Sequence, residues 1–272
     1  MVYTGDMRVH GPRSDMTEEF IEKACESEPV AMICEGTRMA ATERRKNHSE
    51  QQVKQGSNEI VSDTGKIVFV TRYSRDMDRF RSLYNVAKEN NRNFIISTRD
   101  AYLLSKLVDD KRLDLPDPVK AETIRVYYKR KKSGEHNEKD YYVWERPFLE
   151  KKVTWQDVHD NQSEFLMDLN FYQFGELIDI RPEAGSHFIH SMSEPFSEED
   201  IEDEVMHNWL SHFDMNFHQL HASGHMNREQ IVERIGRVKP KRVFPIHTEN
   251  PNLFAETCSN VQKIKRGKSY TI

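Results

Sequence analysis

The hydrophobic positions between residues 65 and 108 fall into two alternating patterns. Lys66–Val70 and Asn93–Ser97 are short, mostly apolar runs of the kind found in buried strands. The stretches 76–90 and 101–108 repeat their apolar side chains every three to four residues, as amphipathic helices do. Two successive strand–helix units predict an α/β fold with a parallel, doubly wound sheet.

The same reasoning extends the predicted elements toward both ends of the chain. Further strands are expected at 30–34, 124–128, 141–144, 163–167, 242–246 and 267–272. Further helices are expected at 17–27, at 197–210 with Ser197 as a capping residue, and at 227–238. The polar stretch 38–60 is expected to be an exposed helix or a linker.

Length and composition describe a soluble globular protein. The chain has 272 residues, 31% of them charged and 36% hydrophobic, which is enough for one large domain or two smaller ones. No stretch approaches the ~20 apolar residues of a membrane span, and the first residues lack the features of a secretory signal. We therefore expect a cytoplasmic protein that does not bind membranes.

The cysteine pattern and the net charge argue against two further classes of protein. Cys25, Cys34 and Cys258 form no CxxC pair, which argues against a disulfide scaffold or a cysteine-based zinc site and favours buried, reduced thiols. A net charge of -5 argues against a protein that coats nucleic acid by bulk electrostatics. The basic run Lys129–Lys132 is expected to be a solvated hairpin tip or loop, with a phosphate-binding role as the alternative.

Three polar residues each follow an apolar, strand-like run. They are Asp6, Glu35 and His247, and the carboxyl ends of strands are where α/β sheets build their sites. Taken singly, each has an ordinary explanation: a turn cap, a surface carboxylate and a strand-end side chain. Taken together, they predict a site at one edge of a sheet.

Histidines are concentrated in the last third of the chain. On one helix, His218, His221 and His225 would lie on one face as a metal site. The pair Ser223–Gly224 favours a loop instead, because glycine disfavours helix interiors and lets backbone approach a ligand closely. We expect His221, Ser223, His225 and backbone amides to face a phosphate. Four other histidines are expected to be structural or exposed: His187, His190, His207 and His212.

Four short motifs give the chain a resemblance to a known family. Tyr3–Asp6 (Tyr-Thr-Gly-Asp) resembles the fourth lactamase motif of the metallo-β-lactamase fold. Cys34–Thr37 (Cys-Glu-Gly-Thr), Ser223–His225 (Ser-Gly-His) and Ile246–Glu249 (Ile-His-Thr-Glu) resemble the three β-CASP motifs, in family order. The chain thus resembles β-CASP nucleases, closest to ribonuclease J-like enzymes and related RNA 3′-end processing nucleases.

This resemblance implies a fold and a division into domains. The fold is a partial metallo-β-lactamase αββα sandwich into which a doubly wound β-CASP domain is inserted. The implied boundaries are 1–55 for part of the lactamase domain, 56–212 for the β-CASP domain and 213–272 for the returning lactamase segment.

The resemblance also implies an activity, the metal-dependent hydrolysis of phosphodiester bonds in RNA by a hydrolase involved in RNA processing. The centre would hold two divalent ions, Zn²⁺ in the first place with Mn²⁺ or Mg²⁺ as alternatives. Asp6 would bridge the ions and His247 would ligate one of them. His225 would protonate or stabilise the leaving oxygen, and Glu35 would orient its imidazole and favour the charged form.

Substrate-binding positions follow from the same resemblance. His221 and Ser223 would hold the scissile phosphate. Ser74, Arg75, Ser191 and Ser193 follow strand-like or turn segments, at positions that receive a 5′ phosphate in exonuclease members of the family.

One family motif, H-x-H-x-D-H, has no counterpart here, since the chain contains no HxH sequence. In the family this motif precedes Tyr-Thr-Gly-Asp and supplies most metal ligands. The chain alone is therefore expected to bind metal poorly and to be inactive, as the C-terminal portion of an enzyme or as half of a split one whose other chain supplies the ligands. Unpaired strand edges would favour association, including homo-oligomers.

Two other functions remain as alternatives. One is a non-catalytic RNA-binding subunit, or pseudoenzyme, that pairs with an active homologue. The other is a nucleotide-binding, flavodoxin-like domain built on residues 65–108. The latter ranks last, because the chain has no GxGxxG motif and no P-loop.

Overall fold

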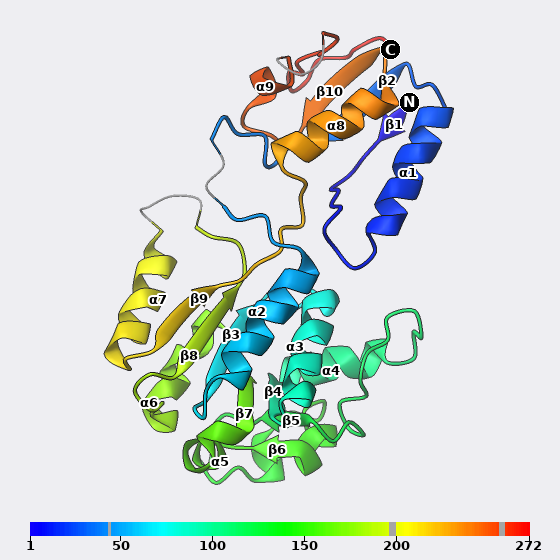
Figure 1. The fold of residues 1–272 in the computed structure, drawn as a ribbon. Helices are drawn as coiled ribbons and strands as arrows, with labels where there is room; N and C mark the ends of the chain where they lie inside the picture. The colour runs from blue at the N-terminus through cyan, green and yellow to red at the C-terminus, as the bar shows by residue number, and fades with distance from the viewer. Residues whose placement is uncertain (43–44, 196–199, 256–258) are drawn as a thin grey trace. The chain divides into compact units, whose positions relative to one another are not determined.

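The chain forms two compact units, each built around a parallel sheet (Figure 1). The computed structural model describes residues 1–42, 45–195, 200–255 and 259–272. Unit 1 comprises Met1–Ser49 and Ala222–Ile272, and unit 2 comprises Glu50–His221. The predicted α/β class, with a parallel-sheet unit inserted into the sequence of another, is confirmed.

Unit 1 contains a sheet of three parallel strands in the order β1-β2-β10. These strands are β1 (Val2–Tyr3), β2 (Ala31–Glu35) and β10 (Arg242–Ile246). Within its described residues, the same unit has the helices α1 (Ser14–Glu26), α8 (Arg228–Val238) and α9 (Pro251–Ala255). Ile21 of α1, Met32 of β2 and Ile231 of α8 share one hydrophobic core. Because the strands are parallel, their carboxyl ends meet at one edge.

Unit 2 contains a seven-stranded parallel sheet in the order β6-β5-β4-β7-β3-β8-β9. Its strands are β3 (Val68–Arg72), β4 (Asn93–Ser97), β5 (Ile124–Tyr127), β6 (Lys152–Val153), β7 (Phe165–Asp168), β8 (His187–Ser191) and β9 (Asn216–Gln219). From β3 the chain runs outward through β4, β5 and β6. It then returns to place β7 between β3 and β4, and adds β8 and β9 beyond β3. This reversal is the signature of a doubly wound sheet.

Alternate side chains of each strand pack against helices on opposite faces of this sheet. Val68 and Val70 face a core shared with α2 (Glu50–Ser62), α3 (Met77–Glu89) and α4 (Thr98–Leu107). Phe69, between them, faces a second core shared with α5 (Trp155–Asp160), α6 (Leu177–Ile180) and α7 (Ile201–His212). The described part of the unit also contains the 3-10 helices η1 (Glu138–Asp140), η2 (Arg146–Lys151), η3 (Gln162–Glu164) and η4 (Phe171–Glu176).

The limits of unit 2 differ from the boundaries inferred for the inserted domain, 56–212. The unit begins at Glu50, because α2 packs on α3 and contributes Val61 to the core. It ends at His221, because β9 pairs with β8 from His187↔Asn216 to His190↔Gln219.

Two predicted strands are wrong. Residues 141–144 form a turn, in which the amide of Tyr142 donates to the Glu145 carboxylate at 2.9 Å. Residues 267–272 form no strand, since the bridge beside β10 is made by Val261, which pairs with Val243. The helix expected from 197 begins at Ile201 with Asp200 as its cap. Ser197, the predicted cap, and Cys258 lie outside the described residues.

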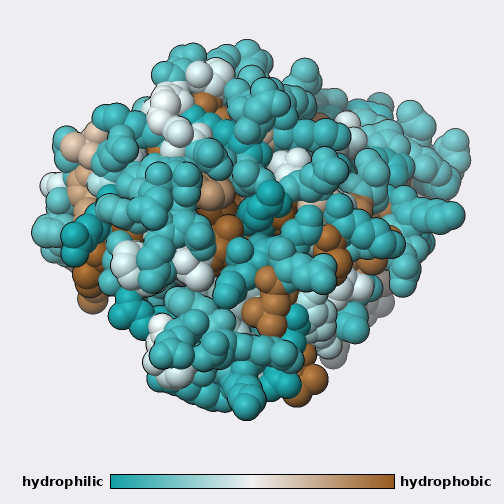
Figure 2. All heavy atoms as spheres, turned by 90° about the horizontal axis from the view of Figure 1, so that it is seen from below, coloured by the Kyte–Doolittle hydropathy of each residue, from teal (hydrophilic) through white to brown (hydrophobic). Residues whose placement is uncertain are grey.

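The face shown in Figure 2 is predominantly hydrophilic, with hydrophobic side chains scattered among polar ones. This agrees with a mean hydropathy of -0.81. In the described part of the chain, no helix is long and apolar enough to span a bilayer. Cys25 is half-buried and Cys34 is buried.

Candidate active site

Three of the predicted site residues lie at the carboxyl edge of the unit 1 sheet. Glu35 is the last residue of β2, His247 follows β10 directly, and Asp6 lies three residues after β1. The pairs Tyr3↔Ile33 and Ile246↔Glu35 fix the register that brings these ends together. The fold therefore brings the three polar strand ends together at one edge, as the sequence predicted.

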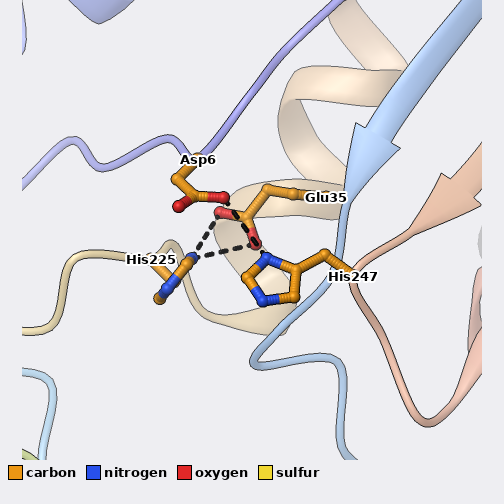
Figure 3. A group of neighbouring side chains, drawn as sticks. All are labelled: Asp6, Glu35, His225 and His247. Carbon is orange, nitrogen blue, oxygen red and sulfur yellow. Dashed lines mark hydrogen bonds and ion pairs between the residues drawn. The ribbon is translucent and has the colours of Figure 1, made fainter.

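His225 joins this group from the loop that precedes α8 (Figure 3). The predicted loop conformation is confirmed, since residues 221–226 form neither helix nor strand. The amide of Met226 donates to the carbonyl of Met7 at 2.8 Å, which fixes the loop beside the segment that carries Asp6. Each of the four residues Asp6, Glu35, His225 and His247 offers a ligand atom within 4.8 Å of the others.

Glu35 is a buried carboxylate held by three donors. Its oxygens accept from the amides of Met7 and Thr37, both at 3.1 Å, and lie 3.1–3.2 Å from Nδ1 of His225. Burial alone would raise the pKa of Glu35, but the bond to His225 and the two amide bonds together hold the pKa below its ordinary value. Glu35 is therefore ionised in this setting.

His225 is the partner of that carboxylate and is half-buried. The bond to Glu35 raises the pKa of His225, burial opposes the shift, and the charges of Glu35 and Asp6 add to it. The backbone amide of His225 donates to the Ser223 hydroxyl at 3.1 Å. Because Nδ1 faces Glu35, Nε2 is the ring nitrogen that can contact a ligand.

His247 and Asp6 form a second contact, exposed to solvent. Nδ1 of His247 lies 3.3 Å from Oδ1 of Asp6. His247 has a φ of +48°, a left-handed conformation that costs a non-glycine residue ~1–3 kcal/mol and is concentrated at functional sites. Gly5, with a φ of +57°, provides the corresponding turn before Asp6 without that cost.

The donors of this cluster fit zinc. Zinc takes imidazole nitrogens and carboxylate oxygens, and two donors at ~2.0–2.1 Å from one tetrahedral ion lie about 3.3–3.4 Å apart. The 3.3 Å between His247 and Asp6 matches that separation. Four donors are fewer than two ions require, and the described residues contain no other such cluster.

Sequence reasoning missed three residues that support the cluster. Oγ1 of Thr37 lies 3.2 Å from Nδ1 of His247, and Oγ1 of Thr4 accepts from the amide of Glu35 at 3.2 Å. Nε2 of His10 lies 2.6 Å from the carbonyl oxygen of Ser223. Both threonines belong to the motifs already quoted, Tyr-Thr-Gly-Asp and Cys-Glu-Gly-Thr, so a polar residue next to each acid was the available signal. No comparable signal marks His10.

Ser74, Ser193 and His221 lie near one another within unit 2. Ser74 and Ser193 both line a cavity of about 430 Å³ at the carboxyl ends of β3, β7 and β8. Oγ of Ser193 lies 3.4 Å from Nε2 of His221, whose ring packs edge-on against Tyr73. Burial, followed by the charge of Arg79, lowers the pKa of His221 to about 4, so this imidazole is neutral at pH 7.

Arg75 and Ser191 differ in their surroundings. Arg75 is exposed. Ser191 is only 1% exposed, and its hydroxyl donates to the carbonyl of Leu220 at 2.6 Å and contacts the guanidinium of Arg79. The hydroxyl of Ser191 is therefore occupied by contacts inside unit 2.

The four histidines expected to be structural or exposed all lie in unit 2. Nδ1 of His187 lies 2.9 Å from Nε2 of His218 with the rings stacked, and His190 bonds the Gln219 side chain at 2.7 Å. His207 packs on Phe217, and His212 is exposed.

Comparison with known proteins finds one family match, which covers a C-terminal segment of the chain. Residues 212–265 match the family described as a Zn-dependent metallo-hydrolase RNA specificity domain. This segment contains both His225 and His247. No curated protein matches the chain.

A solved structure has a similar fold. It is a protein of unknown function from Enterococcus faecalis V583, with a TM-score of 0.71 and 21% sequence identity. The match covers 98% of this chain and 57% of that one, so the chain spans little more than half the length of this similar protein. Identity at this level shows the fold alone.

Proposed function

We propose that this chain forms part of a ribonuclease J-like, zinc-dependent hydrolase that cleaves phosphodiester bonds in RNA. One observation carries the proposal: Asp6, Glu35, His225 and His247, from four separate segments, place their ligand atoms within 4.8 Å of one another. The family match at residues 212–265, whose printed description names a zinc-dependent metallo-hydrolase and RNA specificity, supports it.

In this proposal, Asp6 and His247 hold the metal. Their 3.3 Å contact suits two ligands of one ion, and their exposure leaves them accessible to it. When bound, a pair of divalent ions activates water and neutralises charge on the phosphate. The ligands that a second ion needs would come from a metallo-β-lactamase segment carrying H-x-H-x-D-H, whether in the same polypeptide or in another chain.

His225 is the proposed general acid. With Nδ1 bonded to Glu35, the imidazolium can release a proton from Nε2 to the leaving oxygen of the substrate. Its raised pKa favours the protonated ring, and the ionised Glu35 fixes the ring orientation. Glu35 thus acts by positioning His225.

In this proposal, polar side chains bind the phosphate groups of the RNA. The hydroxyl of Ser223 accepts from the amide of His225 and retains its own hydrogen for a phosphate oxygen. His221 is proposed to bind the scissile phosphate as a neutral donor. Ser74, Arg75 and Ser193 are proposed to bind a 5′ phosphate. Ser191 is buried, so it is proposed to support this phosphate site without contacting the phosphate.

The test is reconstitution of activity. The chain is co-expressed with a fragment of a metallo-β-lactamase-fold nuclease that carries H-x-H-x-D-H, and hydrolysis of labelled RNA is measured with zinc and with a chelator. We expect metal-dependent hydrolysis that His225→Ala abolishes. His212→Ala, which removes an exposed histidine outside the cluster, is the matched control. Activity that survives His225→Ala would remove His225 from the mechanism.

A second candidate is a non-catalytic RNA-binding subunit. It is favoured by the small number of donors in the cluster, which is the one such group among the described residues. This candidate predicts RNA binding without hydrolysis after reconstitution, whereas the first predicts both.

A further inference from the structure

A second cavity lies in unit 2, at the carboxyl ends of β4 and β5, with a volume of about 450 Å³. Its walls come from the start of α4, from the segment between β5 and η2, and from η4 with the residue before it. The volume is within the ~300–1,000 Å³ typical of ligand pockets. The metal cluster and the serine, arginine and histidine residues proposed to bind phosphate lie outside it. Lys129 and Lys131, from the basic run with a phosphate-binding role as its alternative, line it.

Aromatic rings and cations share the lining of this cavity. The rings and cations are Tyr127, Tyr141, Tyr142, Trp144, Tyr172, Arg99, Lys129 and Lys131. Glu145 is the single carboxylate among the described lining residues. The chain as a whole carries a net charge of -5, so this positive lining is a local feature.

Two of the rings are open to solvent to an unusual degree. Tyr142 is 65% exposed and Tyr172 is 81% exposed. Large aromatic side chains contribute most to stability when they are buried, so rings left in water beside a cavity are available for a ligand. The ring of Tyr142 is nearly parallel to that of Trp144, at 10° and 6.4 Å, which makes a stacking platform.

The platform is held in place by buried contacts of Glu145. This carboxylate accepts from the amide of Tyr142, from Oγ1 of Thr98 and from Nζ of Lys131, all at 2.9 Å. The edge of Trp144 packs against Tyr102 of α4. The rings are therefore positioned before any ligand arrives, which reduces the entropy lost on binding.

The cations differ in how they are paired. Lys131 pairs with Glu145 and lies 5.1 Å from the ring centroid of Tyr142, and Lys129 lies 3.4 Å from Glu176. Arg99 is exposed and pairs with no carboxylate in the described part of the chain. It is therefore the cation that a phosphate would neutralise at least cost.

We propose that this cavity, with Tyr142 and Tyr172 as stacking surfaces and Arg99 as a phosphate contact, binds a segment of single-stranded RNA. Rings interleaved with cations along a concave surface are how proteins hold single strands without reading their sequence. A duplex keeps its bases stacked on each other and offers none to these rings. The inference rests on the proposed function for the choice of RNA as the ligand.

Binding to a short, fluorescein-labelled oligouridine tests this proposal by fluorescence anisotropy, with the full chain and EDTA present. The chelator separates binding from hydrolysis, so the result is independent of the metal cluster. Tyr142→Ala and Tyr172→Ala should each weaken binding by about 5- to 150-fold. Val143→Ala is the matched control, because Val143 is 76% exposed between two lining residues but does not line the cavity.

The salt dependence tests the cation. Each phosphate contact with a single strand contributes ~0.7 to the slope of log K against log salt, so Arg99→Ala should reduce the slope by about that amount. Arg130→Ala is the control, since this exposed arginine lies beside Lys129 in the sequence but outside the lining.

Three results would overturn the proposal. They are binding that is unchanged in the Tyr142→Ala, Tyr172→Ala double variant, equal binding of duplex and single strand, and loss of self-association instead of RNA binding in the double variant. The last would assign the rings to a protein interface. Hydrolysis by the reconstituted enzyme, together with any of these results, would leave the proposed function intact while this proposal fails.

Discussion

Oε2 of Glu35 lies 3.1 Å from Nδ1 of His225, although the two residues are 190 positions apart in the sequence. Glu35 ends a buried strand, and His225 lies in a loop held against the Met7 segment. A contact between such distant positions needs the whole of unit 1 to fold, and it gives His225 both an orientation and a raised pKa.

Glu35→Gln should lower the pKa of His225. The amide keeps the shape of the carboxylate and can still accept from Nδ1 of His225, but it loses the negative charge, so the bond is no longer charge-assisted and the main cause of the raised pKa is weakened. Titration of the histidine ring signals by NMR measures the change. Glu249→Gln, at an exposed position near His247 in the sequence, should leave the pKa of His225 unaltered.

The same substitution should alter the pH dependence of stability. The raised pKa of His225 contributes stability that is present below pH 6.5, the ordinary value, and is lost as the pH rises through the folded-state pKa. The lowered pKa of Glu35 contributes stability that is present above pH 4.5, its ordinary value, and is lost as the pH falls through its folded-state pKa. The difference in urea midpoint between wild type and Glu35→Gln should therefore be largest between those two values. A difference that grows steadily above pH 8 would contradict this account.

The free energy of unfolding of unit 2 should fall in acid because of His221. Its pKa is lowered to about 4 by burial, so below pH 6.5 the unfolded chain takes up a proton that the folded chain refuses. The free energy of unfolding should fall by up to about 1.4 kcal/mol per pH unit between pH 6.5 and 4 from this group. His221→Gln should reduce that slope in urea titrations, whereas the exposed His212→Gln should not.

His247→Ala and Asp6→Ala should each weaken zinc binding by at least about tenfold, because each removes a proposed ligand. Isothermal titration calorimetry on the reconstituted complex measures the loss. Both side chains are exposed, so circular dichroism should show an unchanged fold. Zinc affinity that is the same in both variants and in the His212→Ala control would place the metal elsewhere.

Glu50→Ala should destabilise unit 2 by ~3–5 kcal/mol. It leaves the fully buried guanidinium of Arg79 without the carboxylate that accepts from it at 2.7 and 3.0 Å. Chemical denaturation measures this loss. Glu59→Ala, in the same helix but not buried, should change stability by less than about 1 kcal/mol.

The strands and helices at 65–108 were predictable because their side-chain pattern is local. The apolar periods of 76–90 and 227–238 match α3 and α8 closely. The strand predictions failed at 141–144 and 267–272. At 141–144 the amide of Tyr142 bonds the buried Glu145 carboxylate, and the segment forms a turn. Beside β10, Val261 forms the bridge in place of residues 267–272. Neither partner lies within the segment that it reshapes.

The sequence by itself determined which side chains could perform chemistry, because Asp6, Glu35 and His247 each lie at or just after the end of an apolar, strand-like run. It also determined the parallel, doubly wound character of unit 2. Only the tertiary structure decided the register that places Ile246 beside Glu35, that Ser191 is buried and that Thr37 contacts His247. These depend on strand order and register, which are set by packing between segments far apart in the chain and leave no local pattern to read.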